Sequence, residues 1–320
     1  ALYITSPVKG SGKTALCCGL GKHFLDQGKK VGFLKPAATA DSVDQDARLM
    51  KEVLALEEPV EVLCPVFSDQ TNLESRIKEA YGKVSQGKDV VLIEGILEKK
   101  MAEALAAKVI IVEGYSRDFS GVPNSYKDFG KSLLGVTLNK VPASRLERIR
   151  SEATTRFNQA GMNILGILPE ARSLLTLSIG ELAGQIRGEF LMGADKSSEL
   201  IGNIMLGPKS LDSGLYYFRR KDNKAVIIES ERPDMQLAAL GTSIKCLVII
   251  GERPSPVVLN LAEDKAVPVI MAKGEMANIV TSVEEALSQA KFNRQKLPRL
   301  VEIMEQHFSL KELDKTLGFK

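Results

Sequence analysis

Hydrophobic positions in the first half of the chain fall in short runs that alternate with longer amphipathic stretches. The runs are rich in Val, Ile and Leu, and uninterrupted apolar runs of this length are typical of strands buried on both faces. We predict strands at Leu2–Thr5, Val31–Leu34, Val90–Ile93, Val109–Val112, Leu134–Leu138 and Ile164–Leu168.

The stretches between these strands place apolar residues at helical spacing. We predict helices at Thr14–Asp26, Ala47–Leu56, Asn72–Val84 and Ser144–Ala160. Regular alternation of strand and helix predicts an α/β fold, with a parallel sheet and helices on both of its faces.

The rhythm changes around residues 188–207, where four glycines interrupt the pattern. We therefore predict a first domain over residues 1–190 and a second over residues 191–320. The second region repeats the alternation on a smaller scale and ends in an amphipathic tail, so we expect a smaller α/β domain with C-terminal helices. Its predicted strands are Ala225–Ile228, Leu247–Ile250 and Val267–Met271.

Composition narrows the class of protein without identifying it. Hydrophobic residues make up 44% and charged residues 26% of the 320 residues, as in ordinary globular proteins. The net charge of +3 favours neither nucleic acid nor an anionic membrane as a partner. Four cysteines and two histidines without metal-ligand spacing argue against a zinc site and predict reduced thiols in the cytoplasm.

The strongest chemical signal lies between the first predicted strand and the first predicted helix. Thr5–Thr14 reads TSPVKGSGKT and has the context of a phosphate-binding loop, so we predict bound ATP and Mg²⁺. The predicted nucleotide ligands are Lys9, Gly10, Ser11, Gly12, Lys13 and Thr14. Glycines let backbone N–H groups converge on phosphate oxygens, Lys13 supplies positive charge, and the Thr14 hydroxyl ligates Mg²⁺. Pro7 occupies the place of the first glycine of the usual pattern.

Further polar residues follow predicted strands, and the carboxyl ends of parallel strands face the ligand crevice. Lys35 follows the second strand and Glu94 the third. With Lys13 they form the predicted catalytic set, while Thr14, Asp46 and Glu94 form the predicted metal set. We expect the Asn139 amide to read the edge of adenine.

These motifs resemble those of the dethiobiotin-synthetase-like P-loop proteins, which include the amidation domains of cobyrinate diamide synthases. They are more similar to the N-terminal ATPase-like region of long phosphate acetyltransferases. The matching pieces are Ile4–Thr14, Val31–Pro36, Val90–Gly95, Leu134–Val141 and Leu165–Glu170. The resemblance implies a P-loop NTPase-type sheet, and no acetyltransferase catalytic domain is expected before the chain ends at Lys320.

The second half resembles the DRTGG domain that follows this region in the same family. The matching stretches are Ser210–Arg220, Asn223–Asp234, Gln236–Cys246 and Pro254–Pro268, and the name-giving motif reads Glu231-Arg232-Pro233-Asp234. The resemblance implies a slow ATPase or nucleotide-dependent regulator linked to acyl-phosphate and acetyl metabolism.

Two other functions remain open. One is an ATP-dependent ligase that phosphorylates a small carboxylate or carbamate, and the other is a scaffold that only dimerises. The expected partners are nucleotide, a small carboxylate or acyl-phosphate ligand and a second copy of the chain in a dimer.

Overall fold

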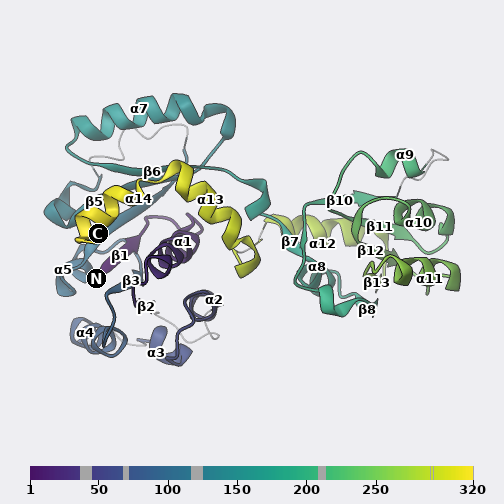
Figure 1. Cartoon of the computed structure of the whole chain (residues 1–320), viewed down its shortest axis with the longest axis horizontal. Helices are drawn as coiled ribbons and strands as arrows, with labels where there is room; N and C mark the ends of the chain where they lie inside the picture. Colours follow the sequence, from purple (N-terminus) through teal and green to yellow (C-terminus); the bar gives the residue numbers. More distant parts are fainter. Residues whose placement is uncertain are drawn as a thin grey trace. The chain divides into compact units, whose positions relative to one another are not determined.

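The structure is a computed structural model that describes residues 1–36, 45–67, 72–116, 125–207, 214–288, 290 and 292–319. Contacts divide the chain into two compact units, Ala1–Ala171 with Lys296–Lys320 and Arg172–Gln295. The second unit is therefore an insertion between two segments of the first (Figure 1).

The first unit is built on a six-stranded sheet in which every described pairing is parallel. Its spatial order is β2 (Val31–Leu34), β3 (Val90–Glu94), β1 (Leu2–Thr5), β4 (Lys108–Gly114), β5 (Leu133–Val141) and β6 (Ile164–Pro169). β1 and β3 are buried along their whole length, so no solvent-facing alternation appears in their sequences. The predicted strands and the parallel α/β fold are confirmed.

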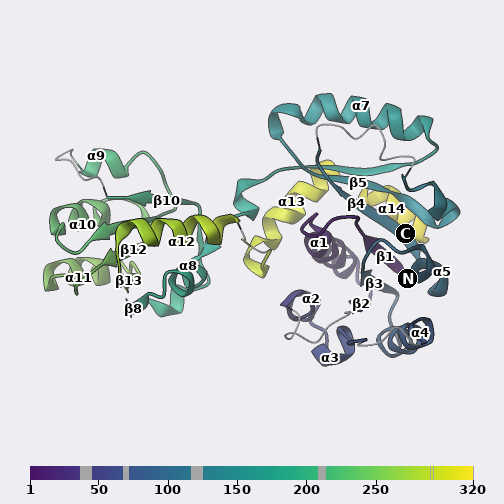
Figure 2. The same ribbon diagram turned by 180° about the vertical axis from the view of Figure 1, so that it is seen from behind.

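Helices cover both faces of this sheet (Figures 1 and 2). Their bounds are α1 (Lys13–Asp26), α2 (Gln45–Leu54), α3 (Val60–Leu63), α4 (Leu73–Val84), α5 (Lys99–Ala104), α7 (Leu146–Gln159), α13 (Leu297–His307) and α14 (Leu310–Leu317). α1 follows the phosphate loop, and its buried residues include Leu16, Leu20 and Phe24. No helix within the described ranges is both long and apolar enough to cross a bilayer.

The segment α13–α14, which we call the strap, returns from the second unit and packs on the first. In α1, a Cβ on Gly19 would lie 2.1 Å from the Met304 sulfur, so this glycine forms a notch for α13. Ser309 N donates to Leu165 O of β6 at 2.7 Å. The contacts of the strap therefore lie on the P-loop helix and on an edge of the first sheet.

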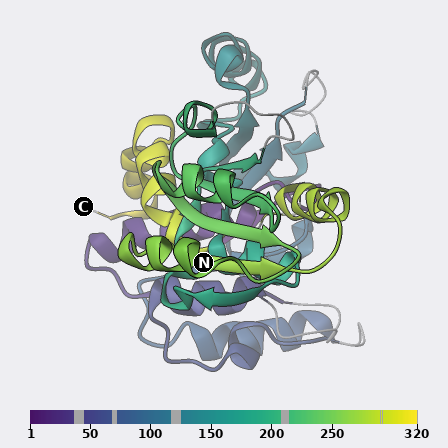
Figure 3. The same cartoon turned by 90° about the vertical axis from the view of Figure 1, so that its right-hand side faces the viewer.

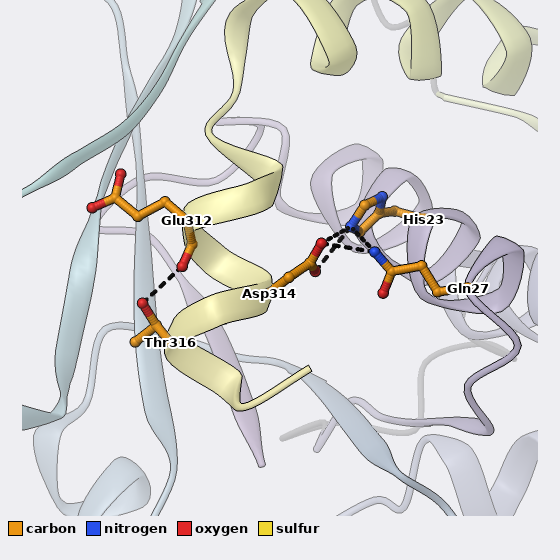
Figure 4. Close-up of polar contacts among 5 residues, drawn as sticks. All are labelled: His23, Gln27, Glu312, Asp314 and Thr316. Carbon is orange, nitrogen blue, oxygen red and sulfur yellow. Dashed lines mark hydrogen bonds and ion pairs between the residues drawn. The ribbon is translucent and has the colours of Figure 1, made fainter. Parts of the chain in front are cut away.

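The last helix of the strap is fixed to α1 by polar contacts. The Asp314 carboxylate accepts a 2.7 Å hydrogen bond from Gln27 Nε2, and both its oxygens lie 3.0 Å from His23 Nε2 (Figure 4). The exposed Thr316 hydroxyl donates to the Glu312 carbonyl within α14 at 2.8 Å. Phe319 adds an edge-to-face ring contact with Phe24, at 5.5 Å between centroids.

The second unit contains a mixed five-stranded sheet, whose strands are drawn in teal and green in Figure 3. Its order is β10 (Asn203–Leu206), β11 (Lys224–Glu229), β12 (Ile244–Ile250), β13 (Val269–Ala272) and β8 (Glu189–Met192), with β8 antiparallel to β13. A short antiparallel pair joins β7 (Leu177–Ser178) to β9 (Leu200–Ile201).

Two apolar layers lie on opposite faces of this second sheet. Consecutive residues of β12 belong to different layers: Val248 to one and Leu247 to the other. The first layer includes α8 (Ile179–Gln185) and α12 (Met276–Ser288), and the second includes α9 (Gly214–Phe218), α10 (Pro233–Leu240) and α11 (Pro256–Asp264). This arrangement agrees with the smaller α/β domain predicted from the sequence.

These contact units differ in two places from the predicted map of residues 1–190 and 191–320. They divide at Ala171/Arg172, and Lys296–Lys320 joins the first unit. The glycine-punctuated segment near 188–207 contributes β8 and β10 to the second sheet. The predicted domain boundary near residue 190 stays a prediction.

Candidate functional site

The phosphate loop joins the end of β1 to the start of α1, as its motif requires. Gly10 has a φ of 73° and Gly12 a φ of 101°, in the left-handed region that favours glycine. A Cβ on Gly12 would also lie 2.2 Å from Asn139 Nδ2. In the part that departs from the usual pattern, Ser6 Oγ accepts from Val8 N at 3.2 Å and turns the chain beside Pro7.

Two side chains near the carboxyl end of β5 hold the loop through its carbonyl groups. Asn139 Nδ2 donates to Ser11 O at 2.8 Å, and Lys140 Nζ donates to Gly10 O at 2.7 Å. Asn139 Oδ1 in turn accepts from Lys140 N at 2.8 Å. Both ends of the Asn139 amide are therefore engaged with protein groups, and its contact with adenine stays a prediction.

The first turn of α1 meets the carboxyl end of β3. The Thr14 hydroxyl donates to Glu94 Oε1 at 3.0 Å. The Glu94 side chain is 5% exposed, and its second oxygen, Oε2, is buried and has no hydrogen-bond partner among the residues that the structure describes. A buried carboxylate oxygen of this kind can accept a metal-bound water or another donor.

Lys35 and Asp46 complete a charged group around Glu94. Lys35 Nζ forms a short ion pair with Asp46 and lies 3.9 Å from Glu94 Oε1. Lys35 follows β2 and Asp46 belongs to the first turn of α2, so three elements bring these side chains together. The structure thus places Lys35, Asp46, Glu94 and Thr14 side by side.

Burial dominates the electrostatics of Glu94. It raises the pKa of the carboxyl from 4.5 to about 7, with Lys35 opposing the rise and Asp46 adding to it. The hydrogen bond from Thr14 and the charge of Lys13 also favour the ionised form. Glu94 is therefore divided between its protonated and ionised forms near neutral pH, as in many functional sites.

The donors at this site suit a nucleotide-bound magnesium ion better than a metal held by protein alone. Among the described residues, no group of three or more His, Cys, Asp or Glu side chains forms a metal cage. Mg²⁺ in P-loop sites takes one hydroxyl, phosphate oxygens and waters. The Thr14 hydroxyl and the unpartnered Glu94 oxygen fit that requirement.

Sequence reasoning missed two residues that shape this site. Lys140, directly after Asn139, has a φ of 60°, and in this left-handed conformation its side chain reaches back to the loop. Tyr3 lies inside β1 and resembles an ordinary core residue, although its hydroxyl bonds to Ile96 O in the turn after Glu94. Lys9, which was predicted to bind nucleotide, is exposed on the loop, and its role stays a prediction.

Known proteins similar to this chain include two phosphate acetyltransferases. The one from Nitrosomonas europaea is 22% identical over 82% of this chain and 43% of its own length. The one from Haemophilus influenzae is 20% identical over 94% of this chain and 50% of its own length. The chain thus spans half or less of these two relatives.

Solved structures with a similar fold include cobyrinic acid a,c-diamide synthase from Mycobacterium smegmatis with an ATP analog and magnesium. It is 14% identical, with a TM-score of 0.37, over 54% of this chain and 88% of its own. The MinC:MinD cell division complex of Aquifex aeolicus is 24% identical, with a TM-score of 0.39, over 54% of this chain and 83% of the matched chain. These superpositions are too loose to bear on function.

Family models account for both halves of the chain. The DRTGG domain model matches residues 181–286. The AAA domain model matches residues 1–176, more than half of the 320 residues, in the segment that carries the P-loop. The chain therefore belongs to the AAA domain family, in its dethiobiotin-synthetase-like P-loop form, and carries a DRTGG domain behind it.

Proposed function

We propose that the first unit binds Mg-ATP and turns it over slowly, as the nucleotide-dependent part of a regulator in acyl-phosphate or acetyl metabolism. The observation that carries this proposal is the convergence of Thr14, Glu94, Lys35 and Asp46 beside the phosphate loop. In this proposal, Lys13 and the loop amides hold the phosphates.

The hydroxyl and carboxylate side chains of the site would have different roles toward Mg²⁺. Thr14 would ligate Mg²⁺ directly, and Glu94 and Asp46 would hold its waters, while the ion neutralises phosphate charge. An ionised Glu94 repels the γ-phosphate, so its presence is useful only if it holds the metal shell or orients an attacking group. Because the pKa of Glu94 is raised to about 7, part of the protein carries a protonated Glu94 at neutral pH. In this proposal the carboxyl loses that proton when Mg-ATP binds.

Calorimetry of ADP and ATP binding, with and without Mg²⁺, tests the nucleotide site. Lys13→Ala removes a charge-assisted phosphate contact and should weaken binding roughly ten- to a hundredfold. Lys22→Ala is a matched control, because it removes an exposed α1 lysine that pairs with Asp26. Equal affinity of wild type and Lys13→Ala would remove the basis of the P-loop assignment.

A ligase is the second candidate, and the position of Lys35 favours it. An ammonium group 3.9 Å from Glu94 could hold a small acid beside the γ-phosphate. The two candidates are separated by phosphate release measured across a panel of small carboxylates and acyl phosphates. Turnover that rises steeply with one carboxylate supports the ligase, whereas a uniformly slow rate supports the regulator.

A further inference from the structure

The backbone directly after Glu94 is tied to the strand that leads into the phosphate loop. Gly95 N donates to Ile4 O at 3.1 Å. The Tyr3 hydroxyl donates to Ile96 O, one residue further along the turn. Two consecutive residues of β1 therefore fix the turn Glu94-Gly95-Ile96, one through its main chain and one through its side chain.

Tyr3 and Gly95 are shaped for each other. A Cβ on Gly95 would lie 2.4 Å from Tyr3 Oη and 2.5 Å from Tyr3 Cε2, closer than Cβ atoms approach other atoms. The Tyr3 side chain is fully buried, so its ring has no room to withdraw. Glycine at position 95 therefore lets the ring lie against the backbone of the turn.

The Tyr3 hydroxyl is suited to holding a position and not to transferring a proton. Burial raises the pKa of Tyr3 well above its usual range, so the group remains an O–H donor at every pH where Glu94 titrates. Its proton is already directed at the Ile96 carbonyl. The bond thus persists whether Glu94 is protonated or ionised.

From this geometry we infer that Tyr3 is a positioning residue: it holds the Glu94-Gly95-Ile96 turn so that the Glu94 carboxylate stays against the Thr14 hydroxyl. The consequence for turnover rests on the proposed function, while the restraint on the turn does not. A residue that only filled the core would be replaced without effect by phenylalanine, because the ring alone provides the packing.

Tyr3→Phe tests this inference by removing one oxygen atom and keeping the ring. The matched control is Tyr126→Phe, which removes another buried hydroxyl, one bonded to Glu113. Losing the Tyr3 bond should speed amide exchange in residues 95–98 by about tenfold, with no change in β4. The control should leave exchange in residues 95–98 at the wild-type rate.

The rate of phosphate release provides a second measurement. This rate would not change in Tyr3→Phe if Tyr3 only filled the core. We expect phosphate release by Tyr3→Phe to fall about tenfold or more while ADP affinity stays within about threefold, because a misplaced Glu94 affects the reaction more than binding. Wild-type exchange and wild-type turnover in Tyr3→Phe would overturn the inference. If wild type binds no nucleotide, the proposed function fails, and amide exchange alone decides the role of Tyr3.

Discussion

Glu94→Gln tests the electrostatics of the site through the stability of the ligand-free protein. The folded carboxyl has a pKa of about 7, against an ordinary value of 4.5. Both states are protonated below pH 4.5, so the carboxyl then costs no stability. As the pH rises from 4.5 to 7, the unfolded chain ionises first, and the free energy of unfolding falls.

The size of this loss follows from the difference in pKa. A difference of one pKa unit between the folded and unfolded states corresponds to about 1.4 kcal/mol. The ionised Glu94 carboxylate should therefore lower the free energy of unfolding by about 3 kcal/mol above pH 7. Glutamine keeps the shape of the side chain and cannot ionise. The free energy of unfolding of Glu94→Gln, compared with wild type, should therefore rise by about 3 kcal/mol between pH 4.5 and pH 8.

Urea unfolding at several pH values in this range, without nucleotide or metal, measures this difference. The two proteins are compared by how their free energies of unfolding change with pH. The glutamine amide makes hydrogen bonds of its own, which shift the free energy of unfolding of the variant by the same amount at every pH. Glu74→Gln is the control, since it removes an exposed carboxylate from α4 and should follow wild type. Parallel curves for Glu94→Gln and wild type would refute the reasoning and place Glu94 in contact with solvent.

Two further predictions concern the packing of the strap on α1. Gly19→Ala should lower the free energy of unfolding by about 1–3 kcal/mol, because the added methyl group meets the Met304 sulfur. Gly82→Ala on α4, where nothing lies within 4 Å of the new Cβ, should instead raise it by about 0.5–1 kcal/mol. Asp314→Asn should cost about 1 kcal/mol in the same urea assay, and Thr316→Ala on the outer face of α14 much less. Equal effects of the two glycine variants, or of the two α14 variants, would contradict this account of the strap.

Strands of the first sheet could be predicted because strands buried on both faces appear as unbroken apolar runs. β8 could not, since its residues are exposed or only partly buried and it is an antiparallel edge strand of four residues. The amphipathic pattern of α13 showed that it has an apolar face, but it did not indicate which surface receives that face. The notch at Gly19 became visible only when Met304 was found against it.

The candidate site was predictable where topology alone brings residues together. Lys35 and Glu94 end neighbouring strands of a parallel sheet, so their proximity follows from the strand order. Lys140 and Tyr3 were not predictable, because a left-handed backbone and a hydroxyl aimed at one carbonyl leave no periodic signal. The pKa of Glu94 likewise depends on burial that only the packed structure reveals.

The inserted arrangement of the units has a consequence for synthesis on the ribosome. Residues 172–295 must be translated before the strap emerges, which takes on the order of ten seconds at ordinary elongation rates. During that delay the notch on α1 and the Leu165 carbonyl of β6 lack their partners. An N-terminal fragment ending near residue 190 should therefore remain incompletely packed, and adding residues 296–320 as a separate peptide should restore its stability.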